Sequence, residues 1–79
     1  MDEVIAKVKG IIEQVGSMEG LTLDEDIYAA GFSSVSALDL LTELESIFEV
    51  SISDDEFIQS RSIRQLAAMI QRLQPTESV

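Results

Sequence analysis

The sequence predicts an all-α protein, a small four-helix bundle with three longer helices, one short helix and a long loop after the first helix. Apolar side chains recur at intervals of three and four residues in three segments, the spacing that places them on one face of a helix. The chain has 79 residues and no Cys, so we expect one domain whose core is not cross-linked by disulfides. Hydrophobic residues make up 46% of it, too many for a disordered acidic segment.

The first helix is predicted to end near Gly16 and Ser17. One apolar stripe runs along it, formed by Val4, Ile5, Val8, Ile11, Ile12 and Val15. The acids at positions 2 and 3 suit the positive N-terminal end of the helix dipole. Gly10 inside the helix costs about 1 kcal/mol relative to Ala, so packing of the stripe must offset that cost.

Residues 17–33 form a connection that is longer than helical bundles usually need. Leu21, Leu23 and Ile27 are spaced along it and are predicted to anchor it to the core. The acidic run 24–26 between these anchors is expected to face water. Long loops in small domains are either functional or disordered, and the apolar anchors favour a functional loop.

The second helix is predicted from about Ser34 to Glu49, with Asp39 and Glu43 on a different side from its apolar stripe. Val50 and Ile52 alternate with serines and are interpreted as an extended connection that buries both side chains, because a lone strand would have no partner. The apolar stripe of this helix consists of Leu38, Leu41, Leu44 and Phe48.

Two capping boxes mark the starts of the last two helices. Ser53 followed by Glu56 predicts a short helix that ends near Gln59. Ser62 followed by Gln65 predicts the last helix, whose apolar stripe is Ile63, Leu66, Ala67 and Ile70. We expect the domain to span residues 1–74, with a flexible tail at residues 75–79 that begins at Pro75. The predicted core contains Val8, Ile12, Leu38, Leu41, Phe48, Leu66 and Ile70.

The charge distribution predicts partners with basic surfaces. The net charge is −10, which argues against nucleic acid as a partner because its phosphates would be repelled. Between Gly10 and Ser60 there are twelve carboxylates and no Lys or Arg. A basic partner would be steered onto this middle region. On charge alone, the alternative that the acids only confer solubility is the stronger one.

Catalysis and metal binding are not predicted. The chain has no His and no Cys, the residues that most often act as general bases and metal ligands. Asp24 and Asp26 begin as a calcium loop would, but Tyr28, Ala29 and Val35 then break the pattern. The first residues of the chain lack the basic start and apolar stretch of a signal peptide, and no apolar run approaches the ~20 residues that span a bilayer. We therefore expect a cytoplasmic, monomeric protein that is not an enzyme and does not insert into membranes.

A pair of serines lies where the long loop meets the second helix. A hydroxyl at a helix N-terminus lies near free N–H groups and the positive end of the dipole, which favour a phosphate. The stronger interpretation on physical grounds is that Ser33 or Ser34 only caps the helix, and Ser36 with Asp39 forms a further capping box. A phosphate ester here is compatible with the chemistry and is not required by it.

The stretch from Asp26 to Val35 resembles the attachment motif of acyl carrier proteins. In that family a glycine, one further residue and then Asp-Ser-Leu mark the serine that receives 4′-phosphopantetheine. Aligning on Gly31 places Ser34 at the modified position. Ser33 replaces the usual Asp, and Val35 replaces the usual Leu. A motif with serine in place of the aspartate resembles that of specialised stand-alone carriers. The resemblance continues through residues 38–41, 44–45, 48–55 and 62–66, and so covers nearly the whole chain.

The resemblance implies a carrier that holds acyl intermediates as thioesters on a 4′-phosphopantetheine arm attached to Ser34. It would present them to enzymes of a lipid or secondary-metabolite pathway. The implied partners are a phosphopantetheinyl transferase, an acyl- or aminoacyl-activating ligase, and acyl-processing enzymes with basic docking surfaces. The residues implied in partner binding are Val35, Asp39, Glu43, Glu45, Asp54, Asp55 and Glu56.

An apolar acyl chain could shelter between the second and last helices, although an ordinary core is the favoured interpretation of each wall residue. Two alternatives to acyl transport stay open: an aminoacyl carrier, and an acidic helical domain that binds a partner without any covalent group. The possible wall residues are Leu38, Leu41, Phe48, Ile58, Ile63 and Leu66.

Overall fold

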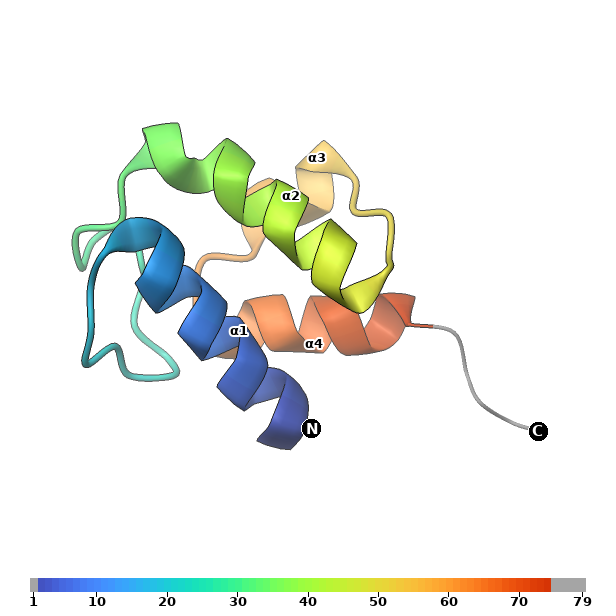
Figure 1. The fold of residues 1–79 in the computed structure, drawn as a ribbon, viewed down its shortest axis with the longest axis horizontal. Coiled ribbons are helices and arrows are strands. Elements are labelled where there is room, and N and C mark those ends of the chain that lie inside the picture. Colours follow the sequence, from blue (N-terminus) through green and yellow to red (C-terminus); the bar gives the residue numbers. More distant parts are fainter. Residues whose placement is uncertain (1, 75–79) are drawn as a thin grey trace.

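A computed structural model describes residues 2–74 and, over that range, contains helices and no strands. Figure 1 shows α1 crossing α4 and lying beside α2, and α1 packs against both of them. The prediction of an all-helical bundle is confirmed; the predicted tail at 75–79 lies outside the described residues. The elements are α1 (Asp2–Gly16), the 3-10 helix η1 (Ser34–Ser36), α2 (Ala37–Phe48), α3 (Asp54–Gln59) and α4 (Ile63–Leu73).

The core draws apolar side chains from all four α-helices and from the connections between them. Five of the seven predicted core residues are buried, namely Val8, Ile12, Phe48, Leu66 and Ile70. None of the helices in the described range is long and apolar enough to cross a lipid bilayer. The remaining buried apolar residues are Val4, Leu21, Ile27, Phe32, Leu40, Leu44, Ile52, Phe57, Ile63, Ala67 and Met69.

The predicted apolar stripe of α2 is correct only in part: Leu44 and Phe48 are buried as predicted, but Leu40 takes the place of Leu38. Leu40 and Leu44 are fully buried, whereas Leu38 is 74% exposed and Leu41 is only half-buried. Leu38 lies three residues before Leu41 and Leu40 lies four residues before Leu44, so helical spacing fits either one, and packing in the shared core selected Leu40. The helix also begins later than predicted, because residues 34–36 form a separate 3-10 turn.

The long loop is fastened to the start of α4. Leu21 and Ile27 are buried and Leu23 is half-buried, so the predicted anchors are confirmed. The Ile27 N–H donates to the Arg61 carbonyl at 2.8 Å, and the Arg64 N–H donates to the Leu23 carbonyl at 3.0 Å. These bonds bring a segment from the first third of the chain against one from its last third.

The expectation that residues 24–26 face water holds for Asp24, whose side chain is 76% exposed, whereas Glu25 and Asp26 are half-buried. Asp24 pairs with Arg64 and Asp26 pairs with Arg61, each with 2.7 Å between an Nε and a carboxylate oxygen. Both pairs join residues at least 35 positions apart. Helical periodicity carries no signal for such contacts, because they depend on how the loop lies against α4.

Serine hydroxyls cap the last two helices, as predicted. Ser53 Oγ accepts the Glu56 N–H at 3.2 Å, and Ser62 Oγ accepts the Gln65 N–H at 3.1 Å. In a full capping box the Glu or Gln side chain also accepts the N–H of the cap serine, but Glu56 and Gln65 have other partners here. Gln65 Oε1 accepts the Arg61 N–H at 2.8 Å, and the Glu56 carboxylate pairs with Arg72 on α4. The third predicted box is not formed, because Ser36 makes no side-chain cap hydrogen bond.

The connection after α2 is neither helix nor strand, and it buries one of the two side chains predicted to be buried. Ile52 is 7% exposed and Val50 is half-buried. The Glu45 carboxylate holds this segment, because its Oε2 accepts the Ile52 N–H at 2.9 Å. α2 ends at Phe48, with Glu49 in the left-handed region at φ 55°.

Candidate functional site

The two serines at the end of the loop have different roles in the backbone. Ser33 is the N-cap of η1, and its Oγ accepts the Val35 N–H at 3.2 Å. Ser34 is the first residue of η1, and its side chain is exposed. Of the two serines that the sequence offers as the cap, the structure selects Ser33. One hydroxyl is therefore engaged in the fold, and the other faces solvent.

Phe32 fixes the position of this serine pair. Its side chain is 3% exposed, its N–H donates to the Ile27 carbonyl at 2.9 Å, and its ring meets Tyr28 edge-on with centroids 5.7 Å apart. Gly31 precedes it at φ 118°, a conformation that L side chains rarely adopt. The glycine lets the chain turn inward at Phe32 and return to the surface at Ser33.

A groove of about 300 Å³ lies beside Ser34. Ser34 and Ala37 line one part of it, and the α3 residues Phe57 and Ile58 line another. Of the six wall residues suggested for an acyl shelter, only Ile58 lines this groove. Ile63 and Leu66 are instead fully buried in the core. The remaining residues that line the groove are Tyr28 and Arg61.

Arg61 is the charged residue of this groove. Its Nε donates to Asp26 Oδ2 at 2.7 Å, and its guanidinium carbon lies 4.7 Å from the centroid of the Tyr28 ring. The hydrogen bond from Arg61 is the main cause that lowers the pKa of Asp26. Partial burial raises the pKa of Tyr28, so its phenol stays protonated at neutral pH. The sequence interpretation missed both residues, which become neighbours of Ser34 only in the folded chain.

The residues implied in partner binding fall into two groups. Val35 is 84% exposed, and the acids at 39, 43, 54 and 55 are exposed as well. Glu45 and Glu56 are half-buried, and their carboxylates already contact the Ile52 N–H and Arg72. Leu38, which was predicted to be in the core, is a large apolar side chain on the outer surface of α2.

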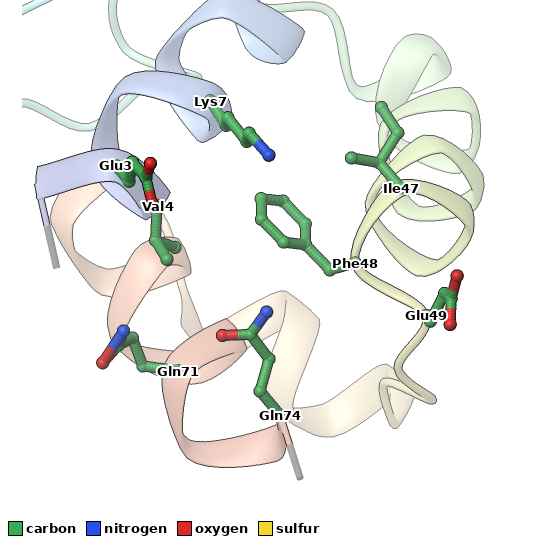
Figure 2. Close-up of a pocket in the computed structure, with 8 residues that line it drawn as sticks. All are labelled: Glu3, Val4, Lys7, Ile47, Phe48, Glu49, Gln71 and Gln74. Carbon is green, nitrogen blue, oxygen red and sulfur yellow. The ribbon is translucent and has the colours of Figure 1, made fainter. Parts of the chain in front are cut away.

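A second pocket, of about 340 Å³, lies between α1, α2 and α4 and does not include Ser34. Figure 2 shows Lys7 from α1 and Phe48 from α2 pointing into it, with Gln71 and Gln74 from the last helical turn on another side. Phe48, one of the suggested acyl walls, lines this pocket. The structure therefore does not bring the suggested wall residues together around one cavity.

The chemistry available at Ser34 is that of an exposed, unactivated hydroxyl. The chain has no His, and no carboxylate of residues 2–74 is hydrogen-bonded to the Ser34 side chain. Within the same range, no three acidic residues gather into a group that could hold a metal ion. Ser34 can accept a group that another protein delivers, and a base for that reaction must come from the other protein.

A protein-family model described as the phosphopantetheine attachment site matches residues 3–70. The fold is similar to that of BlmI, a type-II acyl carrier protein from Streptomyces verticillus involved in bleomycin biosynthesis. The TM-score is 0.80 at 14% identity, over 90% of this chain and 86% of that one.

Two further solved structures share the fold. The A1-type carrier domain from module 5 of MLSA1 has a TM-score of 0.69 at 22% identity, over 94% of this chain and 81% of that one. The acetyl actinorhodin acyl carrier protein from Streptomyces coelicolor has a TM-score of 0.63 at 23% identity, over 92% and 88%. No curated protein sequence matches this chain at a significant level.

Proposed function

The chain belongs to the family of phosphopantetheine attachment domains and functions as an acyl carrier, and we propose that Ser34 carries its 4′-phosphopantetheine arm. The observation that supports this residue is the contrast between the two serines. Ser33 Oγ is used by the Val35 N–H, whereas Ser34 is exposed at the rim of a groove. A modifying enzyme can reach Ser34 without breaking the cap.

The residues around Ser34 fit such an arm. The hydroxyl is accessible, the groove beside it is formed largely by apolar atoms, and its one charged residue is a cation that suits a phosphate. When attached, the arm supplies the thiol that this Cys-free chain lacks. A transferase moves the phosphopantetheine group from coenzyme A to Ser34 Oγ: the Oγ–P bond forms as the pyrophosphate bond of coenzyme A breaks, adenosine 3′,5′-bisphosphate leaves, and a base of the transferase takes the hydroxyl proton.

We propose that partner enzymes dock on the surface next to Ser34. Val35 and Leu38 expose apolar side chains there, and Asp39 and Glu43 on α2 expose carboxylates. Acyl carriers work with a phosphopantetheinyl transferase and biosynthetic enzymes, and basic docking surfaces on those enzymes would complement the acids. Asp54 and Asp55 at the start of α3 extend the acidic surface. Glu45 and Glu56 would contribute less, because each already has a partner within the chain.

We propose an acyl cargo that belongs to a lipid or secondary-metabolite pathway. The apolar groove next to Ser34 supports an acyl cargo over an aminoacyl one. The likeness to a carrier involved in bleomycin biosynthesis supports the secondary-metabolite pathway. Carrier domains of this family are generally non-catalytic, and the unactivated Ser34 supports the proposal that this chain is not an enzyme. We place it in the cytoplasm as a monomer that partner enzymes visit in turn.

Intact-mass measurement tests the attachment residue. Co-expression with a broad-specificity phosphopantetheinyl transferase should raise the mass of the wild-type chain by one phosphopantetheine group. Ser34→Ala should abolish the increase and leave the helical circular dichroism spectrum unchanged. Ser33→Ala is the matched control: it should keep the modification and lose about 0.5–2 kcal/mol of stability with the cap. Modification of Ser34→Ala, or an unmodified wild type with several transferases, would refute the assignment.

A further inference from the structure

We propose that Arg61 binds the phosphodiester of the arm on Ser34 and so holds the first part of the arm over the neighbouring groove. The inference rests on the proposed attachment at Ser34 and adds a residue far from it in sequence. Ser34 and Arg61 line the same groove of about 300 Å³, so both are within reach of one small ligand. Arg61 is the only charged residue among the six that line it.

Among residues 2–74, Arg61 is the only Lys or Arg that lines the groove beside Ser34. Arg64 pairs with Asp24, Arg72 pairs with Glu56, and neither lines the groove. The two lysines are on α1, where Lys9 pairs with Glu13. A phosphodiester would add negative charge to a chain whose net charge is already −10. A cation beside the new charge offsets part of that repulsion.

The guanidinium of Arg61 is held in place before any phosphate arrives. Asp26 Oδ2 accepts its Nε–H at 2.7 Å, and the Tyr28 ring lies 4.7 Å from its central carbon. Asp26 is itself oriented, because its Oδ1 accepts the N–H groups of Tyr28 and Ala29 at 2.9 and 3.3 Å. The side chain of Arg61 is therefore restrained from two sides by the loop that leads to Ser34.

The remaining donors of Arg61 match the oxygen atoms of a phosphodiester. A guanidinium has five N–H donors, and the bond to Asp26 uses the one on Nε. No other side-chain hydrogen bond of Arg61 occurs within residues 2–74, and its side chain is 50% exposed. The terminal NH₂ groups can thus donate to phosphate oxygens while Nε stays on Asp26. Such an exposed pair is weak, which lets the arm swing away to a partner enzyme.

Side-chain NMR on the wild-type chain tests the contact without any substitution. Attachment of 4′-phosphopantetheine, verified by intact mass, should shift the Arg61 guanidinium N–H signals and leave those of Arg64 unchanged. Arg64 is the matched reference, because it makes the same 2.7 Å pair with a loop aspartate and does not line the groove. If neither arginine shifts in a sample that carries the arm, Arg61 does not bind the phosphodiester.

Thermal unfolding of modified and unmodified forms gives a second test. The quantity compared is the change in Tm that each protein shows when it is modified. This change should be about 2–5 °C more negative in Arg61→Gln than in wild type or Arg64→Gln. The difference should shrink in concentrated NaCl, and Arg61→Lys should restore part of it. Equal differences for the two glutamine variants would overturn the proposal.

The same experiments distinguish the contact between Arg61 and the phosphodiester from a failure of attachment and from binding of the cargo. A mass that never rises on coexpression refutes attachment itself, whereas a modified chain with an unresponsive Arg61 refutes only the contact. If the Arg61 signals move only after the arm is acylated, the residue binds cargo and the proposal is wrong.

Discussion

Asp26 shows how one side chain connects segments that are far apart in the sequence. Its two carboxylate oxygens accept backbone N–H groups of its own loop and pair with Arg61, 35 positions later. The bond from Arg61 is the main cause that lowers the pKa of Asp26, and burial opposes it. The loop that presents Ser34 is held in part by this charged pair.

The Asp26 pair predicts a pH dependence of stability. A carboxyl whose pKa is lower in the folded than in the unfolded chain stabilises the fold above its ordinary pKa, near pH 4. That contribution is lost as the pH falls through the lower, folded value. Urea unfolding followed from pH 7 down to pH 3 should show a smaller loss of stability for Asp26→Asn than for wild type.

Arg61→Gln should remove part of this pH dependence, because it deletes the largest cause of the lowered pKa of Asp26 and leaves the hydrogen bonds from the Tyr28 and Ala29 N–H groups. The double variant should then show the same pH dependence as Asp26→Asn, since Arg61 acts on this titration only through the Asp26 carboxyl. If Asp26→Asn loses stability with falling pH as steeply as wild type, the pair does not stabilise the fold. Glu13, whose pKa is lowered chiefly by its hydrogen bond with Lys9, retains its own contribution in all variants.

At the scale of elements, α2 has an inner and an outer face that both carry leucines. Leu40 and Leu44 are fully buried, and Leu38 is 74% exposed next to the exposed Val35. The inner leucines bind the helix to the core, which leaves the outer apolar residues available for contacts with another protein. One helix thereby holds the bundle together and presents the surface beside Ser34.

Replacing Leu40 or Leu38 by alanine should distinguish the buried face of α2 from its exposed face. Leu40→Ala should cost about 2–5 kcal/mol of unfolding free energy, because it removes buried methyl groups and leaves a cavity. Leu38→Ala should change stability by less than about 0.5 kcal/mol, since the side chain is largely in water. Urea titrations followed by circular dichroism measure both. The reverse order would mean that Leu38 rather than Leu40 lies in the core, as periodicity predicted.

The two glycines of α1 are predicted to respond oppositely to alanine. A Cβ at Gly10 would meet no atom within 4 Å, so Gly10→Ala should stabilise the helix by up to about 1 kcal/mol. A Cβ at Gly16 would lie 2.6 Å from a ring carbon of the buried Phe32. Gly16→Ala should therefore destabilise the fold, by about 1–3 kcal/mol. Thermal unfolding of both variants measures the contrast, and equal shifts would mean that Phe32 moves aside freely.

At the scale of the whole molecule, the Lys and Arg residues lie near the two ends of the chain, and most Asp and Glu residues lie in its middle. The fold pairs three arginines with acids of distant segments. The carboxylates of Asp39 and Glu43 stay exposed on α2. The surface near Ser34 therefore keeps negative charge that can attract a basic partner.

Reversing these exposed acids should slow association with a cognate enzyme. Asp39→Lys with Glu43→Lys should lower the association rate more than the control reversal of Glu3 and Glu19, which are also exposed and change the net charge equally. The wild-type rate should fall as salt rises. Stopped-flow binding to a phosphopantetheinyl transferase measures both effects. Equal effects of the two reversals would mean that the acids only confer solubility.

The sequence by itself determined the features that depend on neighbouring residues. Helical spacing located the three longer helices, and serine capping located the short one and set the starts of the last two at Ser53 and Ser62. Local chemistry also limited the cap at the end of the loop to Ser33 or Ser34, of which the structure uses Ser33. These interactions act over three or four residues, so the printed sequence already contains both partners of each one.

Only the tertiary structure decided which face of α2 is buried and what surrounds Ser34. Leu38 and Leu40 both fit helical spacing, and packing in the shared core chose Leu40. The groove joins Tyr28 from the loop with Arg61 from the connection before α4, which no local pattern relates. Such neighbours arise when the loop and the helices share one small core. Their identity depends on the packing of the whole chain rather than on the spacing of residues along it.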